Sequence, residues 1–255
     1  MTVKEFHEKL TELYPRTLSA EWDNDGIMVS PDVNAEVRRV LVALDATDGA
    51  IKYAAENGYD TLLVHHPMIF AGARTVTRES FIGKRIIDAS VGGVSVISLH
   101  TRLDAGDGGV NDTLLSTLGY ASAGKFGDDE MPEIGRIADI PAMTAGELAR
   151  MIKQKLECEA VRLTGDPDKL VHRLGVCGGA GGDLLWDAIF EGCDVFLTGE
   201  CGYNKSEDAV EDGMITIEAG HFYTEAPVCG VLAFLAESIA GAEVGYYDSC
   251  PSRMI

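Results

Sequence analysis

The feature that most constrains the fold is a repeated alternation of buried strand patterns with amphipathic helix patterns. The runs "VRRVLVAL", "YDTLLV" and "VSVISL" are apolar and rich in β-branched residues, and helical patterns at "DGAIKYAAENG" and at residues 81–89 separate them. Strands that alternate with helices pair in parallel, because each helix carries the chain back along the sheet. We therefore predict an α/β fold with mixed, mostly parallel sheets flanked by helices.

The alternation occurs twice. Residues 39–64 align without a gap on residues 173–198, and the later "HTRLDAGDGGV" aligns with "HFYTEAPVCGV". The second alignment pairs His100 with His221 and Asp104 with Glu225. We interpret the pattern as an internal duplication that gives two lobes of similar topology, expected at residues 1–125 and 126–255. Chance similarity between two βαβ units is the alternative reading of the first alignment alone.

Composition narrows the class of protein. A chain of 255 residues with 46% hydrophobic content can bury one large core or two small ones. Its formal charge of −20 opposes a phosphate backbone, and no basic patch offsets it, so nucleic acid is a disfavoured partner. The first residues have the pattern of an amphipathic helix rather than of a targeting segment. No apolar run of about 18 residues stands out, which argues against a membrane segment. The six cysteines form no C-x-x-C pair. We expect a cytoplasmic protein with reduced thiols and no membrane segment.

Four histidines lie just beyond predicted strands. His65 and His66 end the run "LLVHHPMIF", and His100 and His221 follow later strands. Sites in α/β sheets form at this carboxyl edge. Imidazoles and carboxylates together are suitable ligands for zinc, iron, manganese or cobalt. The absence of thiolates from the set argues against a closed structural zinc site. Three imidazoles and the two carboxylates of Asp104 and Glu225 are more ligands than one tetrahedral ion with an open position can use. We therefore predict two divalent ions about 3.5 to 4 Å apart at the interface of the lobes.

Each cluster also has an ordinary structural reading. A histidine at a strand end is often simply hydrogen-bonded, Asp104 or Asp107 could cap the helix that follows, and Glu225 could lie in the first turn of a helix. Three clusters at corresponding strand ends favour the shared metal site.

Six motifs carry a family resemblance over nearly the whole chain. In order they are "WDNDG", "LLVHHPMIF", "HTRLDAGDGGVND", "GVCGGAGGDLL", "DVFLTGE" and "GHFYTE". They resemble the NGG-interacting-factor-like dinuclear metal family, whose members carry the name GTP cyclohydrolase I type 2. The resemblance implies a two-lobed α/β subunit, a two-metal centre between the lobes and a ring-shaped homohexamer. The metal ligands that it implies are His65, His66, Asp104, His221 and Glu225, and the chain departs from the pattern at none of them.

Two bridged ions with open positions favour hydrolysis of a small molecule, and the resemblance implies a nucleotide. His100 is the candidate for proton transfer, with orientation of Asp104 as the alternative. Glu200 takes the place of His66 in the second lobe, where it could accept a proton, order a water or simply be solvated. The glycine loop in "GVCGGAGGDLL" could cradle a phosphate, or its glycines could serve a turn with positive φ. The alternative function is that of a ring-shaped scaffold or regulatory protein, which would bind the metals without catalysing a reaction.

Overall fold

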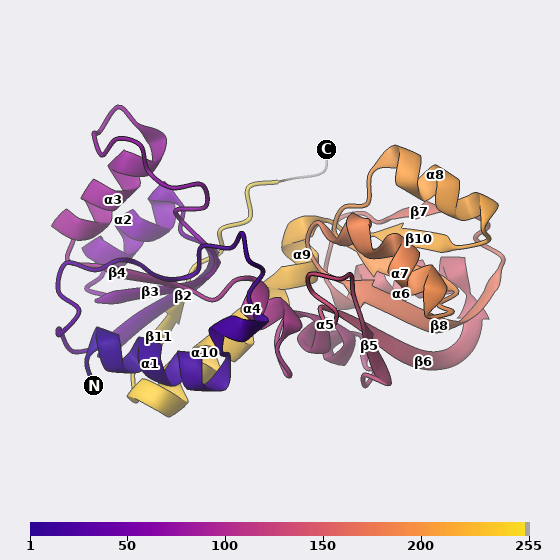
Figure 1. Ribbon diagram of the computed structural model, residues 1–255, viewed down its shortest axis with the longest axis horizontal. Coiled ribbons are helices and arrows are strands. Elements are labelled where there is room, and N and C mark those ends of the chain that lie inside the picture. The colour runs from indigo at the N-terminus through magenta and orange to yellow at the C-terminus, as the bar shows by residue number, and fades with distance from the viewer. Residues whose placement is uncertain (253–255) are drawn as a thin grey trace. The chain divides into compact units, whose positions relative to one another are not determined.

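The computed structural model describes residues 1–252, which form an α/β protein with two mixed sheets, each flanked by helices (Figure 1). The predicted fold class is therefore confirmed at this level. The described chain divides into two compact units. The first unit combines Met1–Leu103 with Val228–Cys250, and the second is built mainly from Asp104–Pro227.

The first sheet has five strands in the order β1-β4-β3-β2-β11. Strands β2, β3 and β4 pair in parallel through helical crossovers, β11 adds in parallel beside β2, and β1 pairs antiparallel with β4. The strands are β1 (Gly26–Val29), β2 (Arg39–Asp45), β3 (Thr61–His66), β4 (Ser95–Ser98) and β11 (Glu243–Tyr246). The helices of this unit are α1 (Val3–Leu13), α2 (Asp48–Glu56), α3 (Phe81–Val91) and α10 (Cys229–Ala240).

Helices cover both faces of the first sheet. Helices α2 and α3 pack on one face, over a core that includes Leu41, Leu62 and Val96, while α1 and α10 lie on the other (Figure 1). Successive residues of a strand point to opposite faces, so strands covered on both sides read as continuous apolar runs. Each fully buried Val or Leu contributes about 1.5 to 3 kcal/mol. The sheet is thus a rigid base for the residues at its carboxyl edge.

The second sheet has six strands in the order β5-β6-β8-β9-β10-β7. Its strands are β5 (Gly124–Phe126), β6 (Gly135–Thr144), β7 (Arg162–Thr164), β8 (Leu170–Cys177), β9 (Val195–Thr198) and β10 (Ile215–Glu218). Strands β8, β9 and β10 are parallel, and β5, β6 and β7 add antiparallel. The helices are α5 (Val110–Leu118), α6 (Ala145–Lys155), α7 (Leu185–Phe190), α8 (Tyr203–Glu211) and α9 (His221–Glu225). Helices α5 and α6 cover one face, and α7 and α8 cover the other. The short helix α4 (Thr101–Ala105) links the two units along the chain.

The compact units divide the chain differently from the lobes expected at 1–125 and 126–255. The physical reason is that β11 pairs with β2, which returns the C-terminal segment to the first sheet. The expected boundary also falls inside β5, a strand of the second sheet.

Both sheets share a parallel β-α-β-α-β core, and one detail recurs at each first crossover. The carboxylate of Asp60 accepts hydrogen bonds from the backbone N–H groups of Arg38 and Arg39, and Asp194 does the same for His172 and Arg173. The helices that follow the third strand start differently, because His100 precedes α4 whereas His221 is the first residue of α9. Internal duplication stays a prediction.

Within residues 1–252, one helical stretch, His221–Ala240, is long and apolar enough by length and composition to cross a membrane. This is weak evidence, because Leu232 and Ala236 of α10 are buried and the helix packs on β2. A core helix passes the same test.

Candidate metal centre

Two of the candidate ligands end strand β3. His65 is buried, and its Nδ1 lies 2.9 Å from the backbone oxygen of Leu99. His66 pairs in register with Asp45 at the end of β2, and its Nδ1 lies 2.8 Å from Asp45 Oδ1. The strand ends here because Pro67 has no N–H to donate to the ladder. A hydrogen bond at Nδ1 fixes the ring and makes Nε2 the atom that can be offered to a metal.

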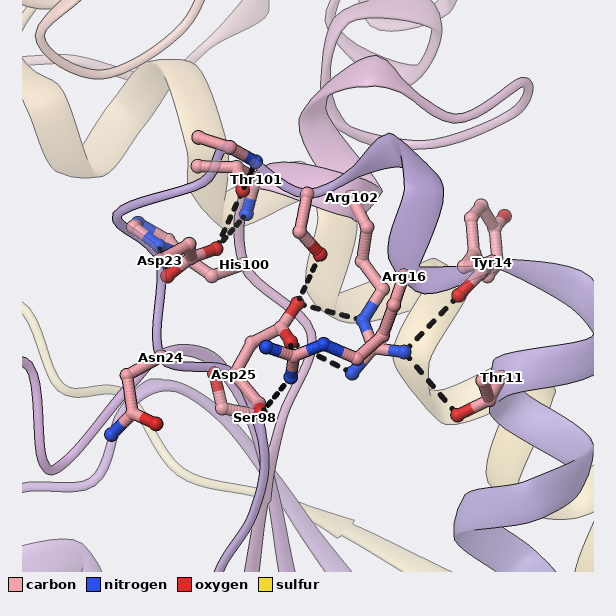
Figure 2. Close-up of polar contacts among 12 residues, drawn as sticks. Thr11, Tyr14, Arg16, Asp23, Asn24, Asp25, Ser98, His100, Thr101 and Arg102 are labelled. Carbon is pink, nitrogen blue, oxygen red and sulfur yellow. Dashed lines mark hydrogen bonds and ion pairs between the residues drawn. The ribbon is translucent and has the colours of Figure 1, made fainter.

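A third imidazole follows the neighbouring strand β4. His100 Nδ1 lies 2.8 Å from Asp23 Oδ1, and Thr101 donates to Asp23 Oδ2 from its backbone N at 3.0 Å and from Oγ1 at 2.5 Å (Figure 2). Burial alone would raise the pKa of Asp23, but the hydrogen bonds from His100 and Thr101 and the charge of His100 lower that pKa to about 2. Asp23 is therefore a carboxylate that holds the His100 ring by its Nδ1.

A buried ion pair anchors the loop that carries Asp23. The guanidinium of Arg102 donates to Asp25 through Nε at 2.7 Å and Nη2 at 2.9 Å, and both side chains are fully buried (Figure 2). Arg102 also donates to the backbone oxygen of Tyr14, and Arg16 donates to Asp25. Two charges buried together need this many partners, because loss of one partner leaves the other charge uncompensated. The motif "WDNDG" is thus a support for the site.

The three imidazoles of the first unit come together. Ring centroids are 4.8 Å apart for His65 and His66, 5.3 Å for His65 and His100, and 5.7 Å for His66 and His100. One possible ligand atom from each lies within 4.8 Å of the others, so the group could hold a metal ion. The donor set fits a borderline divalent ion, because each Nδ1 already lies against a carboxylate or a backbone carbonyl. His100, predicted for proton transfer, is placed where it could also be a ligand.

The second unit holds the remaining predicted residues. His221 and Glu225 lie one turn apart on α9, with Nε2 and Oε2 separated by 3.1 Å. Glu200, which is largely exposed, places Oε1 3.3 Å from His221 Nδ1. The alternative reading of Glu225 as a first-turn residue is wrong, because Glu225 is the last residue of α9.

Asp104 belongs to the same unit as Glu225. Burial raises the pKa of the Cys177 thiol, and the negative charges of Asp104 and Glu225 raise it further. One carboxylate oxygen of Asp104 lies within 4.8 Å of one of Glu225, and the Glu225 side chain packs against Gly178, which follows strand β8. The helix cap that was the alternative role of Asp104 or Asp107 is not found, since the N-cap of α5 is Gly109 and makes no side-chain cap bond.

The glycine loop after β8 is not a phosphate cradle. The N–H groups of four of its glycines already donate within the protein. The turn does require positive φ, since Gly179 has φ +62°, and a Cβ there would lie 2.0 Å from Glu225 Oε1. Gly178 and Gly179 therefore serve close packing against the Glu225 side chain, and Gly181 and Gly182 serve close packing against Cys177 and Cys201. The donors and acceptors are Gly178 to Asn111 Oδ1, Gly179 to Thr224 Oγ1, Gly181 to Thr198 Oγ1 and Gly182 to the Glu200 backbone oxygen.

Each compact unit holds one group of candidate ligands, and each group by itself resembles part of a metal site. His65, His66 and His100 gather in the first unit, and His221, Glu225 and Glu200 gather in the second, with Asp104 near Glu225. Sequence reasoning missed Asp23 and Asp45, which hold the imidazoles of His100 and His66. The signal for Asp45 is its place at the end of one strand, beside the histidine that ends the next.

The fold and the site together define an α/β protein with clusters of His, Asp and Glu side chains that could bind metal ions. The model of the Duf34/NIF3 (NGG1p interacting factor 3) family matches residues 1–247, and the chain belongs to this family. It is 33% identical to the GTP cyclohydrolase 1 type 2 homolog of Clostridium perfringens over 223 residues, which cover 86% of this chain and 85% of that protein. The homolog of the same name from Clostridium acetobutylicum is 31% identical, with 91% and 88% covered.

Solved structures show the same fold. A hypothetical protein of Staphylococcus aureus superposes with a TM-score of 0.91 at 24% identity, covering 100% of this chain and 99% of that one. A Bacillus cereus protein related to NIF3 gives a TM-score of 0.89 at 20% identity, with the same coverage. The predicted family is confirmed.

Proposed function

We propose that the protein is a hydrolase that depends on two divalent metal ions and acts on a nucleotide. The proposal depends on how the three imidazoles are held. His65, His66 and His100 each have a carbonyl or carboxylate oxygen at Nδ1. One possible ligand atom from each lies within 4.8 Å of the others. Histidines that only stabilise a fold have no need of three converging rings.

The ligand set that we propose is His65, His66, Asp104, His221 and Glu225, with the first two from one unit and the others from the second. Joining them requires that the two halves meet around the same ions. Zinc, iron, manganese or cobalt each suits such a set. The bound ions would supply a nucleophilic hydroxide near neutral pH and polarise the group that it attacks.

The residues of the chain itself supply orientation and proton handling. Asp45 and Asp23 keep the Nδ1 protons of His66 and His100 in place, which leaves Nε2 of each ring as the nitrogen that can bind an ion. We propose that His100 takes or returns a proton from Nε2 unless it binds an ion directly. Glu200, 3.3 Å from His221 Nδ1, orients that ring in the same manner.

The name of the curated relatives supports a nucleotide as the substrate, since they are called GTP cyclohydrolase 1 type 2 homologs. The net charge of −20 supports a small molecule over a nucleic acid. We further propose a homohexameric ring, on the family resemblance, and a cytoplasmic location, on the six cysteines that form no C-x-x-C pair.

The test begins with metal analysis of protein purified without chelator. We expect two divalent ions per chain, and fewer in His65→Ala and in Glu225→Gln. A panel of phosphatase, nucleotidase and GTP ring-opening assays with each ion then tests turnover. Full metal occupancy without turnover on any substrate would overturn the hydrolase and favour a metal-binding scaffold.

His100→Ala separates the two roles of that residue. Loss of turnover with both ions retained supports proton transfer, whereas loss of an ion supports direct ligation. Retention of both ions and of full turnover would contradict both roles.

A further inference from the structure

We propose that Trp22 and Phe70 form a stacking surface for a planar, nitrogen-containing aromatic ring of the substrate, beside the three imidazoles. The inference rests on the proposed function, and it adds the class of substrate group and the two residues that recognise it. Both residues lie in the first unit.

Both side chains are exposed and touch each other. Trp22 is 55% exposed and Phe70 is 56% exposed, and their ring centroids lie 5.7 Å apart with planes tilted by 57°. Scattered exposed apolar residues are ordinary on a protein surface, but two large rings in contact form a patch that favours a ligand.

The surrounding backbone is held in place although the rings are exposed. Asp23 and Asp25, on the same loop as Trp22, are buried and bonded to Thr101 and Arg102 (Figure 2). Asn24 Nδ2 donates to the backbone oxygen of Ile69 at 2.5 Å, which ties this loop to the segment that carries Phe70. The rings are therefore presented by fixed loops, which reduces the entropy lost when a ligand binds.

The stacking surface adjoins the candidate metal centre. The His100 ring lies 6.2 Å from the Trp22 ring and 6.2 Å from the Phe70 ring, edge-on in both cases. A ring that contacts Trp22 or Phe70 on the side that faces His100 thus lies next to one of the three imidazoles. Aromatic side chains bind heterocyclic bases by their π faces, at about 1 to 3 kcal/mol per base. A sugar or an aliphatic chain has no such face.

The occupant is a single small heterocycle and not a nucleic acid strand. A strand needs a positive groove to follow its backbone, and the chain carries a formal charge of −20. A purine nucleoside is the probe of this class, and ribose 5-phosphate is the matched probe that lacks the ring.

Tryptophan fluorescence tests the contact directly, because the chain has only two tryptophans, Trp22 and Trp186. In a Trp186→Phe variant, Trp22 is the single reporter. We expect guanosine to quench its emission when it is excited at the red edge of its absorption, and ribose 5-phosphate to leave it unchanged. In the reciprocal Trp22→Phe variant, guanosine should leave the emission of Trp186 unchanged.

Calorimetry on the zinc-loaded protein gives the affinity. Trp22→Ala and Phe70→Ala should each weaken guanosine binding about tenfold, and Trp22→Phe should restore most of it. Phe234→Ala, which removes an exposed ring from α10, is the matched control and should change nothing. Equal guanosine affinity in all four variants, or equal binding of ribose 5-phosphate, would overturn the inference.

Failure of the inference can be told from failure of the proposed function. If guanosine binding depends on Trp22 but the protein shows no turnover, the stacking surface is supported and the proposed hydrolase is contradicted. If the protein turns over a nucleotide and KM is unchanged in Trp22→Ala and Phe70→Ala, the hydrolase is supported and the stacking surface is contradicted.

Discussion

The three imidazoles of the first unit differ in the residue that holds them. A backbone oxygen, that of Leu99, holds His65, whereas the carboxylates of Asp45 and Asp23 hold His66 and His100. A carboxylate makes the imidazole a stronger donor to a metal than a carbonyl does. The two acids can be changed by substitution, and the carbonyl cannot.

We expect Asp45→Asn to weaken zinc binding about tenfold to a hundredfold, because the amide is a poorer partner for His66 Nδ1 than the carboxylate. Competition with a chromophoric chelator measures this. Asp48→Asn makes the same chemical change near the start of α2, where Asp48 pairs with Lys84 and Arg85, and it should leave zinc affinity unchanged. Wild-type affinity in Asp45→Asn would contradict the assigned role.

His7 gives the fold a dependence on pH. Burial lowers the pKa of His7 from its usual 6.5, and the charge of Arg102 lowers it further, against a smaller opposing effect of Asp25. Among the residues that the structure describes, no hydrogen-bond partner reaches the buried Nε2 of His7. The folded state therefore resists protonation, so this contribution to stability is complete above about pH 6.5 and is lost as the pH falls below it.

We expect the free energy of unfolding to fall more steeply between pH 7 and pH 5 in the wild type than in His7→Gln. The slopes should differ by at most about 1.4 kcal/mol per pH unit. Urea unfolding across a pH series measures the effect, and parallel curves would contradict it.

At the scale of elements, the loop between β8 and α7 sets the position of Glu225. We expect Gly179→Ala to destabilise the fold and also to weaken zinc binding, because the new Cβ would collide with the Glu225 carboxylate. Gly192→Ala is the matched control. Gly192 also has positive φ, at +75°, but no atom lies within 4 Å of an added Cβ. It should lose about 1 kcal/mol of stability with zinc affinity intact. Equal losses of zinc affinity in the two variants would contradict the role of the loop.

The sequence predicted those elements whose pattern is local. Strands β2, β3 and β4 and helices α1, α2 and α3 lie where their patterns predict them, because strands buried on both faces are continuously apolar and the helices are amphipathic. The short strands β1 and β11 were not predicted. Only the end residues of β1 are buried and no residue of β11 is, so what makes these segments strands is pairing with β4 and β2, which are remote in the sequence.

The same distinction applies to the site. Histidines beyond strand ends could be recognised from the sequence, and the structure brings three of them together. The strand-end position of Asp45 becomes a signal only with the register of β2 and β3, and Asp23 could not be assigned, because its role depends on a loop that reaches the residues after β4. The glycine loop was ambiguous for a similar reason, since the acceptors of its N–H groups come from distant segments.

At the scale of the whole molecule, bound metal should stabilise the fold. A ligand that binds only the folded chain adds about 2.7 kcal/mol when its free concentration is a hundredfold above Kd. We expect zinc to raise the melting temperature of chelator-treated protein. His65→Ala and Glu225→Gln should each reduce this rise if residues of both units bind the same ions. A full zinc-dependent rise in Glu225→Gln, measured by calorimetry, would show that the second unit does not contribute.

The return of β11 to the first sheet also bears on synthesis of the chain. Arg39 on β2 is bonded to Glu243 on β11, and 204 residues separate them. At about 5 to 20 residues per second, a ribosome leaves that edge of β2 without its neighbour for about 10 to 40 seconds, while the whole second unit emerges and can fold. An apolar strand edge exposed for so long invites pairing with other nascent chains. Chaperone demand and aggregation during expression should therefore depend on how soon β11 becomes available to pair with β2.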